Sequence, residues 1–287
     1  MSKSKSSQKN KPEVPKFILL TAGFLEKIST KLAVQFAAKL FTTPIKHKMP
    51  RREFEMDKNS KQSTLKVPEI NKEIVVYELG KSTKKVLLVH GWSGRGTQLF
   101  KIAETLVENG YSVVSFDAPA HGKSAGNKSI MVEFIASIKE IDKKFGPFEA
   151  AVGHSLGGMA LFNSVKDGFQ IHKLVTIGSG DIVKDIIDEF ISKIKLKKTS
   201  GILLSQHFEK KYGKTMDSFS AYLSAKEINI PVLVIHDEND DDVPVSAAIH
   251  IHKQLKNGSL YITKKLGHRK ILGDEIVIAK TIEFIKN

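Results

Sequence analysis

The sequence predicts an α/β fold built on a mostly parallel sheet with helices on both faces. Strand-like and helix-like segments alternate from about residue 70 to the C-terminus. Several of the strand-like segments are continuously apolar, for example 86–89 and 232–235, as expected of parallel strands buried on both faces. With 287 residues, the chain is also long enough to bury the core of one large domain of this kind.

The composition is that of an ordinary soluble protein, with 41% hydrophobic and 26% charged residues. The chain has no cysteine, which excludes disulfides, thiolate metal sites and cysteine nucleophiles. The formal net charge is +14, and residues 1–66 carry fifteen Lys and Arg against five Asp and Glu. The basic character therefore belongs to the N-terminal segment. We interpret this segment as a solvated arm, because no basic and aromatic pattern indicates a nucleic-acid partner.

The N-terminal segment divides into a tail, a helix and a linker. Residues 1–16 are rich in Ser and Lys and are predicted to be a disordered basic tail. Residues 17–66 are expected to hold an amphipathic helix, up to about residue 41, and a linker to the main domain, which we place at 67–287. The helix carries one apolar stripe, formed by Leu25, Ile28, Leu32, Phe36 and Leu40.

We expect this stripe to pack on the core of the main domain, and peripheral contact with a membrane surface is the alternative. Charged residues such as Glu26 and Lys27 interrupt the apolar run, so it does not predict a transmembrane span. A signal peptide is disfavoured, because the polar region before the apolar run is long and no Ala-x-Ala site follows it. The resulting expectation is a cytoplasmic protein.

The main domain is predicted to contain seven strands with helices between them. The strands are expected at 73–79, 86–90, 112–116, 148–153, 173–177, 232–236 and 259–263. Helices are expected near 97–109, 128–144, 156–167, 245–256 and 274–286. The interval from about 180 to 230 is too long for one crossover helix, so we predict a helical cap insertion there. Its aromatic residues, among them Phe190, Phe208, Tyr212 and Phe219, either pack the insertion itself or face a pocket.

Residues 149–164 predict a strand, a sharp turn and a helix, with Gly153-His-Ser155-Leu-Gly157 at the turn. The glycines two before and two after the serine allow a close approach of the backbone that a side chain would prevent. Such a turn presents the serine hydroxyl above the end of a sheet. The five-residue pattern is short, and a glycine-rich turn without catalytic function would also match it. Other motifs along the chain must therefore decide between the two interpretations.

Further suggestive residues follow other predicted strands, at the edge where parallel α/β sheets place their sites. They are His90-Gly91-Trp92, the run Asp117 to Ser124, the acidic run Asp237 to Asp242, and Gly267-His268. A serine hydroxyl becomes a good nucleophile when an imidazole takes its proton, and the imidazole needs a carboxylate to fix its tautomer. The order serine, aspartate, histidine along the chain supplies these three groups, each after a different strand.

Over about residues 70–287 these motifs resemble those of the α/β-hydrolase superfamily, in particular its serine carboxylesterases and lipases. The matching motifs are His90-Gly91, Asp117-x-Pro119-x-His121-Gly122-x-Ser124, Gly153-x-Ser155-x-Gly157, Asp240 three residues before Val243-Pro244, and Gly267-His268. The resemblance implies that Ser155 is the nucleophile, His268 the general base and Asp240 the carboxylate. It also implies an oxyanion hole formed by the backbone N–H groups of Trp92 and Leu156, and a reaction without cofactor or metal.

The expected activity is cleavage of small-molecule carboxylic esters with small to medium acyl chains. Lipase, thioesterase and acyltransferase activities are the alternatives within this fold, and a non-catalytic binding protein is the alternative outside catalysis. His250 and His252 lie at i and i+2 of a predicted helix, where side chains point apart, so they do not predict a metal site. His121 and His154 are expected to order the site through hydrogen bonds.

The acidic run offers competitors to Asp240 for the role of the catalytic carboxylate. They are Asp237, Glu238, Asp241 and Asp242. The spacing to Val243-Pro244 favours Asp240. Relatives commonly have glycine at the position of Asp237, so the resemblance gives Asp237 no catalytic role.

Overall fold

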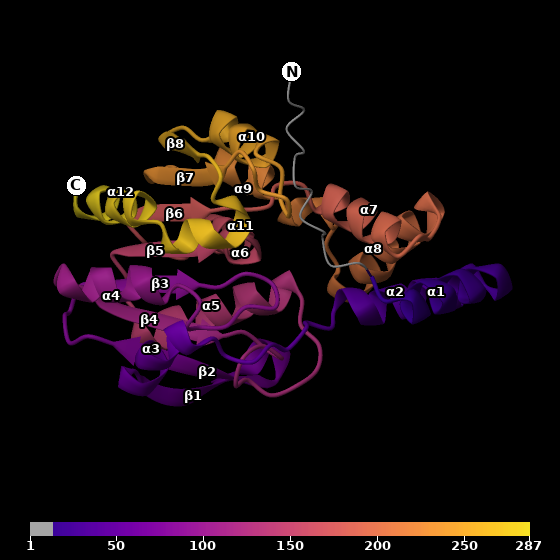
Figure 1. Ribbon diagram of the computed structural model, residues 1–287, viewed down its shortest axis with the longest axis horizontal. Coiled ribbons are helices and arrows are strands. Elements are labelled where there is room, and N and C mark those ends of the chain that lie inside the picture. The colour runs from indigo at the N-terminus through magenta and orange to yellow at the C-terminus, as the bar shows by residue number, and fades with distance from the viewer. Residues whose placement is uncertain (1–13) are drawn as a thin grey trace, which may run out of the picture. The chain divides into compact units, whose positions relative to one another are not determined.

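The computed structural model describes residues 14–287, which contain one eight-stranded sheet (Figure 1). The strands are β1 (Lys61–Val67), β2 (Lys72–Leu79), β3 (Lys85–Val89), β4 (Ser112–Asp117), β5 (Ala150–His154), β6 (Lys173–Ile177), β7 (Val232–Asp237) and β8 (Gly258–Thr263). Their order across the sheet is β1-β2-β4-β3-β5-β6-β7-β8. β2 is antiparallel to both of its neighbours, and all other neighbouring pairs are parallel. The predicted mostly parallel sheet is confirmed.

Helices cover both faces of this sheet (Figure 1). One face carries α3 (Phe54–Asn59), α4 (Phe100–Glu108) and α12 (Glu275–Lys286), and the other carries α5 (Met131–Phe145), α6 (Leu156–Lys166), α9 (Ala221–Glu227) and α10 (Ser246–Gln254). The short helix α11 (Gly267–Lys270) follows β8, and single 3-10 turns lie at Arg51–Glu53, Pro68–Ile70, Asp217–Phe219 and Ile271–Gly273. Because side chains alternate along a strand, Val86 and Leu88 pack in the cluster under α4 and α12.

The strand β1 was not predicted, since its sequence is mostly polar. Only Leu65 and Val67 of its seven residues are buried, and β1 pairs with β2 alone at the edge of the sheet. Polar and lysine-rich edge strands discourage pairing with other chains, and the same composition hides the alternation that identifies a strand. The sheet therefore begins at Lys61, ahead of the predicted domain limit at residue 67.

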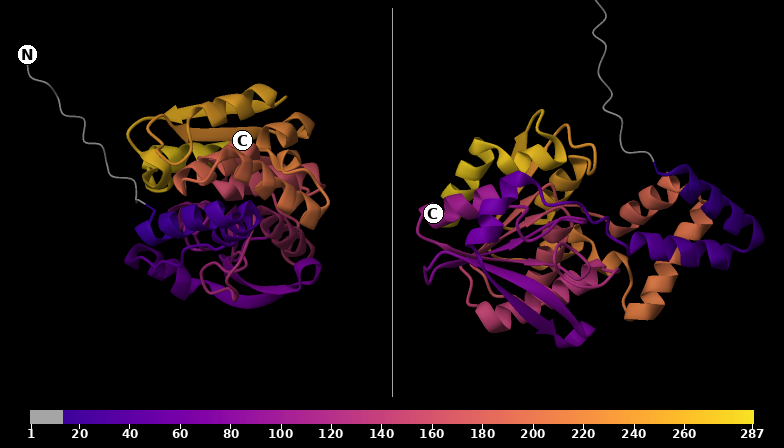
Figure 2. Two further views of the ribbon diagram at one scale, coloured as in Figure 1. Left: turned by 90° about the vertical axis from the view of Figure 1, so that its right-hand side faces the viewer. Right: turned by 60° about the horizontal axis from the view of Figure 1, so that its bottom comes forward.

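The chain divides into two compact units, the sheet unit described above and a helical unit. The helical unit combines residues up to Phe41 with Lys184–Lys214. Its helices are α1 (Lys16–Ile28), α2 (Thr30–Phe41), α7 (Val183–Lys193) and α8 (Lys198–Tyr212), seen together in indigo and salmon in Figure 2. Two segments that are far apart in the sequence thus form one body.

Small side chains and aromatic rings hold the helical unit together. On α2 the buried residues are Ala33, Val34, Ala37 and Ala38, whose small size allows close packing. Phe41 at the end of α2 contacts Phe190 of α7 and Phe208 of α8, with ring centroids 5.1 and 5.7 Å apart. Phe208 is only 2% exposed, so this aromatic residue packs the helical unit itself.

The N-terminal region differs from its prediction in two respects. The expected single helix is two helices, because Ser29 adopts an extended conformation that ends α1. The expected apolar stripe is not buried as a unit, since Ile28 and Leu32 are 60% and 42% exposed. α1 and α2 form the helical unit together with α7 and α8. The predicted insertion at about 180–230 contributes only Lys184–Lys214 to the helical unit. Its last helix, α9, belongs to the sheet unit. Residues 1–13 of the predicted tail lie outside the described residues.

Among residues 14–287, none of the helices combines the length and the apolar character needed to cross a bilayer.

Candidate active site

Ser155 lies at a strained turn between β5 and α6. Its backbone angles are φ 52° and ψ −121°, a region that residues with a side chain rarely adopt. The flanking glycines make the turn feasible. A Cβ atom on Gly153 would lie 2.7 Å from the backbone of Gly157, and one on Gly157 would lie 2.6 Å from the carbonyl oxygen of His90. The half-buried Ser155 therefore stands at the N-terminus of α6, above the carboxyl ends of the parallel strands.

Asp240 and His268 are in direct contact. His268 Nδ1 and Asp240 Oδ2 are 2.7 Å apart, and the Asp240 side chain is 1% exposed. The other carboxylate oxygen, Oδ1, accepts hydrogen bonds from the backbone N–H groups of Asp242 and Val243 at 2.8 Å each. Burial by itself would raise the pKa of Asp240, but hydrogen bonds from His236, His268 and Val243 hold that pKa well below its usual range. Asp240 is thus an anion placed to orient His268.

The competing carboxylates of the acidic run do not contact His268 in the part of the chain that the structure describes. Asp241 and Asp242 are exposed, and Glu238 pairs with Lys264 at 3.2 Å. Asp240 is the member of the run whose carboxylate reaches the imidazole.

The loop after β6 brings His268 and Ser155 to one place. A Cβ atom on Gly178 would lie 3.2 Å from His268 Nδ1, and the preceding residue, Ile177, accepts a hydrogen bond from Ser155 N–H at 3.0 Å. Within residues 14–287, the hydroxyl of Ser155 makes no hydrogen bond to His268. Hydrogen bonds between a nucleophile and its base often become short only when a substrate is bound, so this geometry is compatible with such a pair.

His154 holds the backbone of His268 in position. Its Nε2 atom lies 2.9 Å from the carbonyl oxygen of His268, and the two rings are 4.6 Å apart between centroids. Burial, together with the neighbouring His268, lowers the pKa of His154 to about 3. The neutral ring therefore donates from Nε2 to that carbonyl, which is the ordering role expected from the sequence.

The candidate oxyanion donors border the serine on two sides. Leu156 is the first residue of α6, where backbone N–H groups have no partner within the helix. Trp92 follows Gly91, and a Cβ atom on Gly91 would lie 3.0 Å from the Cβ atom of Ser155. In the described part of the chain, neither the Leu156 nor the Trp92 N–H group donates a hydrogen bond to the protein. Both groups are free to bind a negatively charged oxygen.

Two buried side chains fix the loop that carries Trp92. His90 donates from Nδ1 to the carbonyl of Gly91 at 2.7 Å and accepts at Nε2 from the N–H of Ala118 at 3.0 Å. Burial lowers the pKa of His90 to about 4, so the ring is neutral and both bonds persist. The carboxylate of Asp117 accepts from Gly96 N–H at 2.6 Å and from the Tyr77 hydroxyl at 2.8 Å. The loops after β3 and β4 are thereby tied together.

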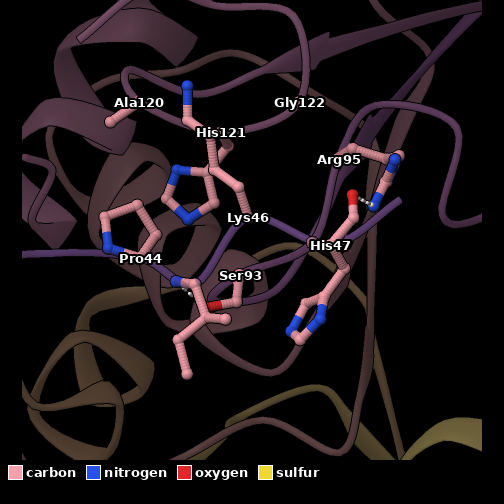
Figure 3. A pocket seen from close by; sticks show the side chains of 10 residues that line it. Pro44, Lys46, His47, Ser93, Arg95, Ala120, His121 and Gly122 are labelled. Carbon is pink, nitrogen blue, oxygen red and sulfur yellow. Dashed lines mark hydrogen bonds between the residues drawn. The ribbon is translucent and has the colours of Figure 1, made fainter. Parts of the chain in front are cut away.

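The chain segment before α3 is fastened to the same loop. The N–H of Ile45 donates to Ser93 Oγ at 2.9 Å, and Arg95 donates to the carbonyl of His47 at 2.7 Å (Figure 3). Between them lies a small pocket that also has His121 in its wall (Figure 3). His121 donates from Nδ1 to the carbonyl of Pro119, and its ring packs edge-on against Trp92. The residues that line this pocket therefore support the loop that carries Trp92.

The structural role of Asp237 was not predicted from the sequence, where this residue was considered only as a competitor of Asp240. Its fully buried carboxylate accepts four hydrogen bonds: at Oδ1 from the N–H groups of Asn239 (3.0 Å) and Gly267 (2.9 Å), and at Oδ2 from the Thr263 hydroxyl (2.7 Å) and Leu266 N–H (3.1 Å). Asn239 precedes Asp240, and Gly267 precedes His268. One carboxylate therefore holds both loops. The signal in the sequence was the aspartate at a position where relatives commonly have glycine.

No metal site accompanies these residues in the described part of the chain, where no group of three or more potential metal-ligating side chains comes together. His250 bonds instead to Asp181, with His250 Nδ1 2.5 Å from the carboxylate.

Comparisons with known proteins identify related folds. Residues 84–210 match the family model described as "alpha/beta hydrolase fold". Comparison with curated protein sequences gave no match. Among solved structures, the chain is similar to a protein from Acinetobacter baumannii AYE proposed to be a lipase, with 22% identity, a TM-score of 0.64, and 82% of this chain and 94% of that chain covered.

It is also similar to an esterase from Exiguobacterium antarcticum, with 17% identity, a TM-score of 0.63, and 79% and 100% of the two chains covered. A bromoperoxidase from Bacillus anthracis has the same identity, a TM-score of 0.61, and 79% and 99% coverage. At these identities the likeness concerns the fold, and proteins with different activities share it.

Proposed function

Because the chain has the fold of the α/β-hydrolase superfamily, as its motifs predicted, we propose that it is a serine hydrolase that cleaves carboxylic esters of small to medium acyl chain. The observation that carries this proposal is the pairing of buried, ionised Asp240 with His268 beside the strained turn of Ser155. An aspartate and a histidine placed next to a serine in this way are the groups that activate a hydroxyl for attack on an acyl carbon.

The proposed reaction assigns one step to each of these groups. Ser155 Oγ attacks the ester carbonyl carbon while His268 Nε2 takes the hydroxyl proton, and Asp240 stabilises the imidazolium that results. The carbonyl oxygen becomes negative and accepts hydrogen bonds from the N–H groups of Trp92 and Leu156. Each such donor contributes about 3 to 4 kcal/mol of transition-state stabilisation. The alcohol leaves with the proton from His268, and water releases the acyl group by the same steps in reverse order.

A fluorophosphonate probe tests the nucleophile directly. The purified protein is expected to gain one covalent adduct, located on Ser155 by peptide mass spectrometry. Ser155→Ala is expected to abolish both labelling and hydrolysis, with a loss of turnover on the order of 10⁴ to 10⁶. Ser93→Ala is the matched control, since Ser93 lies in the loop beside Trp92 but its hydroxyl accepts a bond from Ile45. Labelling that persists in Ser155→Ala, or is absent from the folded wild type, contradicts the proposal.

A series of p-nitrophenyl esters of increasing chain length tests the substrate class. We expect turnover to be greatest with short and medium acyl chains. Greatest turnover with long chains indicates a lipase, and thioester cleavage that exceeds ester cleavage indicates a thioesterase. A protein that the probe labels but that transfers its acyl group to an added alcohol in preference to water is an acyltransferase.

A further inference from the structure

We propose that the exposed apolar face of α1 binds the surface of an anionic membrane. The face consists of Phe17, Leu20, Phe24 and Ile28, which are 69%, 74%, 64% and 60% exposed. Large hydrophobic residues that are scattered over a protein surface need no explanation, but a continuous group of them marks an interaction site. The inference concerns the helical unit and holds whether or not the chain is a hydrolase.

The four residues form a single narrow stripe. At about 100° per residue, Leu20, Phe24 and Ile28 lie within roughly 60° of the direction of Phe17 around the helix axis. Lys16 and Lys27 lie beside one margin of this stripe, within about 40° of Leu20. This is the arrangement of a helix that lies in a membrane interface, with its apolar side in the acyl region and its lysines among the headgroups.

The opposite side of α1 is occupied, and this fixes which face points outward. Ala22 is fully buried, and Glu26 accepts hydrogen bonds from Lys197 N–H at 2.9 Å and from Ser200 Oγ at 2.7 Å. Both partners belong to the start of α8. Because these contacts hold α1 within the helical unit, the stripe is turned outward by the fold and not by a local fluctuation of the helix.

The positive net charge of the helical unit favours an anionic membrane over a second copy of the chain as the partner. Residues 1–41 and 184–214 contain sixteen lysines against six Asp and Glu, a net charge of +10 out of the +14 of the whole chain. A second copy of the chain would bring an equal positive charge to the interface and be repelled, whereas anionic headgroups attract it. The 13 residues of α1 span only about 20 Å along the axis, less than the hydrocarbon core of a bilayer, so the helix would lie on the surface.

Co-sedimentation of the full-length protein with vesicles tests the inference. We expect binding to phosphatidylcholine vesicles with about 30% phosphatidylglycerol, little binding to pure phosphatidylcholine, and a loss of at least about tenfold when NaCl is raised from about 0.1 to 0.5 M. The double variant Leu20→Ser/Phe24→Ser is expected to bind on the order of 100-fold more weakly. Phe54→Ser/Ile276→Ser is the matched control, since these residues are 50% and 61% exposed on the sheet unit.

Melting temperature and light scattering complete the test. Leu20→Ser/Phe24→Ser is expected to keep the melting temperature and the mass of the wild type, because the replaced side chains are exposed. Absence of binding to anionic vesicles overturns the inference, as does an equal loss of binding in both double variants. A lower melting temperature or a smaller mass of this variant than of the wild type, with vesicle binding unchanged, also overturns it and shows that the stripe contacts protein. Because binding is measured without turnover, failure of the proposed hydrolase activity does not affect the result.

Discussion

Replacing Asp237 by asparagine is expected to lower both stability and turnover, because one buried carboxylate holds two loops of the candidate site. Asparagine keeps one acceptor oxygen but places an NH₂ group where two donors now point, the Thr263 hydroxyl and the N–H of Leu266. The hydroxyl can reverse its role, but the N–H cannot. A buried N–H without an acceptor costs about 1 to 3 kcal/mol, and the remaining bonds lose their charge assistance, so we expect a total loss of about 2 to 4 kcal/mol.

The effect on turnover comes from Asn239 and Gly267, which are bonded to Asp237 and adjoin Asp240 and His268. A displacement of about 1 Å in such groups lowers the rate on the order of 100-fold. Urea unfolding gives the free energy of unfolding, and p-nitrophenyl ester hydrolysis gives kcat. Asp241→Asn is the control, since it removes the same charge from an exposed residue of the same loop.

The pH dependence of the free energy of unfolding distinguishes a carboxylate that acts through its charge from a side chain that only fills space. Burial alone would raise the pKa of Asp237, but hydrogen bonds from Thr263, Gly267, Leu266 and Asn239 lower it below its usual range. The carboxylate therefore stabilises the fold above the unfolded pKa of about 3.9, and this contribution is lost as the pH falls through the folded value. The difference between wild type and Asp237→Asn should shrink below about pH 4. A variant that matches Asp241→Asn in stability and in kcat refutes the reasoning.

Three further results are expected. Asp240→Asn should lower kcat on the order of 10⁴-fold, whereas Asp242→Asn should change it only a few-fold; the reverse order in an ester assay shows that the acid is misassigned. Gly157→Ala should cost on the order of 3 kcal/mol in urea unfolding, because its Cβ meets the carbonyl oxygens of Val89 and His90; a wild-type stability contradicts the close approach. Stability should fall as the pH drops from about 6.5 to 4, because the unfolded chain takes up a proton that His90, with its pKa lowered to about 4 by burial, does not. For His90 this amounts to about 2 kcal/mol at pH 5, and urea unfolding of His90→Asn should lack that part of the pH dependence.

Hydrophobic patterning was sufficient to predict the sheet, because its central strands are continuously apolar. β6 was predicted with its observed limits, and β3 and β7 to within one residue. The edge strand β1 was missed because burial of only two side chains leaves no pattern. The break between α1 and α2 was missed because the periodicity continues across Ser29, and only the extended backbone of that residue shows the interruption.

Long-range partners explain the remaining differences. The stripe of Leu25, Ile28 and Leu32 was expected to be buried, yet α1 turns Ala22 and Glu26 inward. Glu26 finds its donors in α8, more than 150 residues away, and no local pattern predicts such a pair. The motifs did locate the loops of the candidate site, since short turns after parallel strands converge by geometry. The departure from glycine marked Asp237, but its role depends on backbone N–H groups whose positions the sequence does not give.

The discontinuous composition of the helical unit constrains the order in which the chain can fold. α1 and α2 are synthesised first, but their partners α7 and α8 follow Phe41 by about 140 residues, and β1 to β6 all lie in that interval. Closing so long a loop costs chain entropy that only the late contacts offset. During synthesis the sheet can therefore begin to assemble while the inner sides of α1 and α2 are still uncovered. A chain that stops before residue 184 would expose those sides permanently, and would depend on chaperones or aggregate.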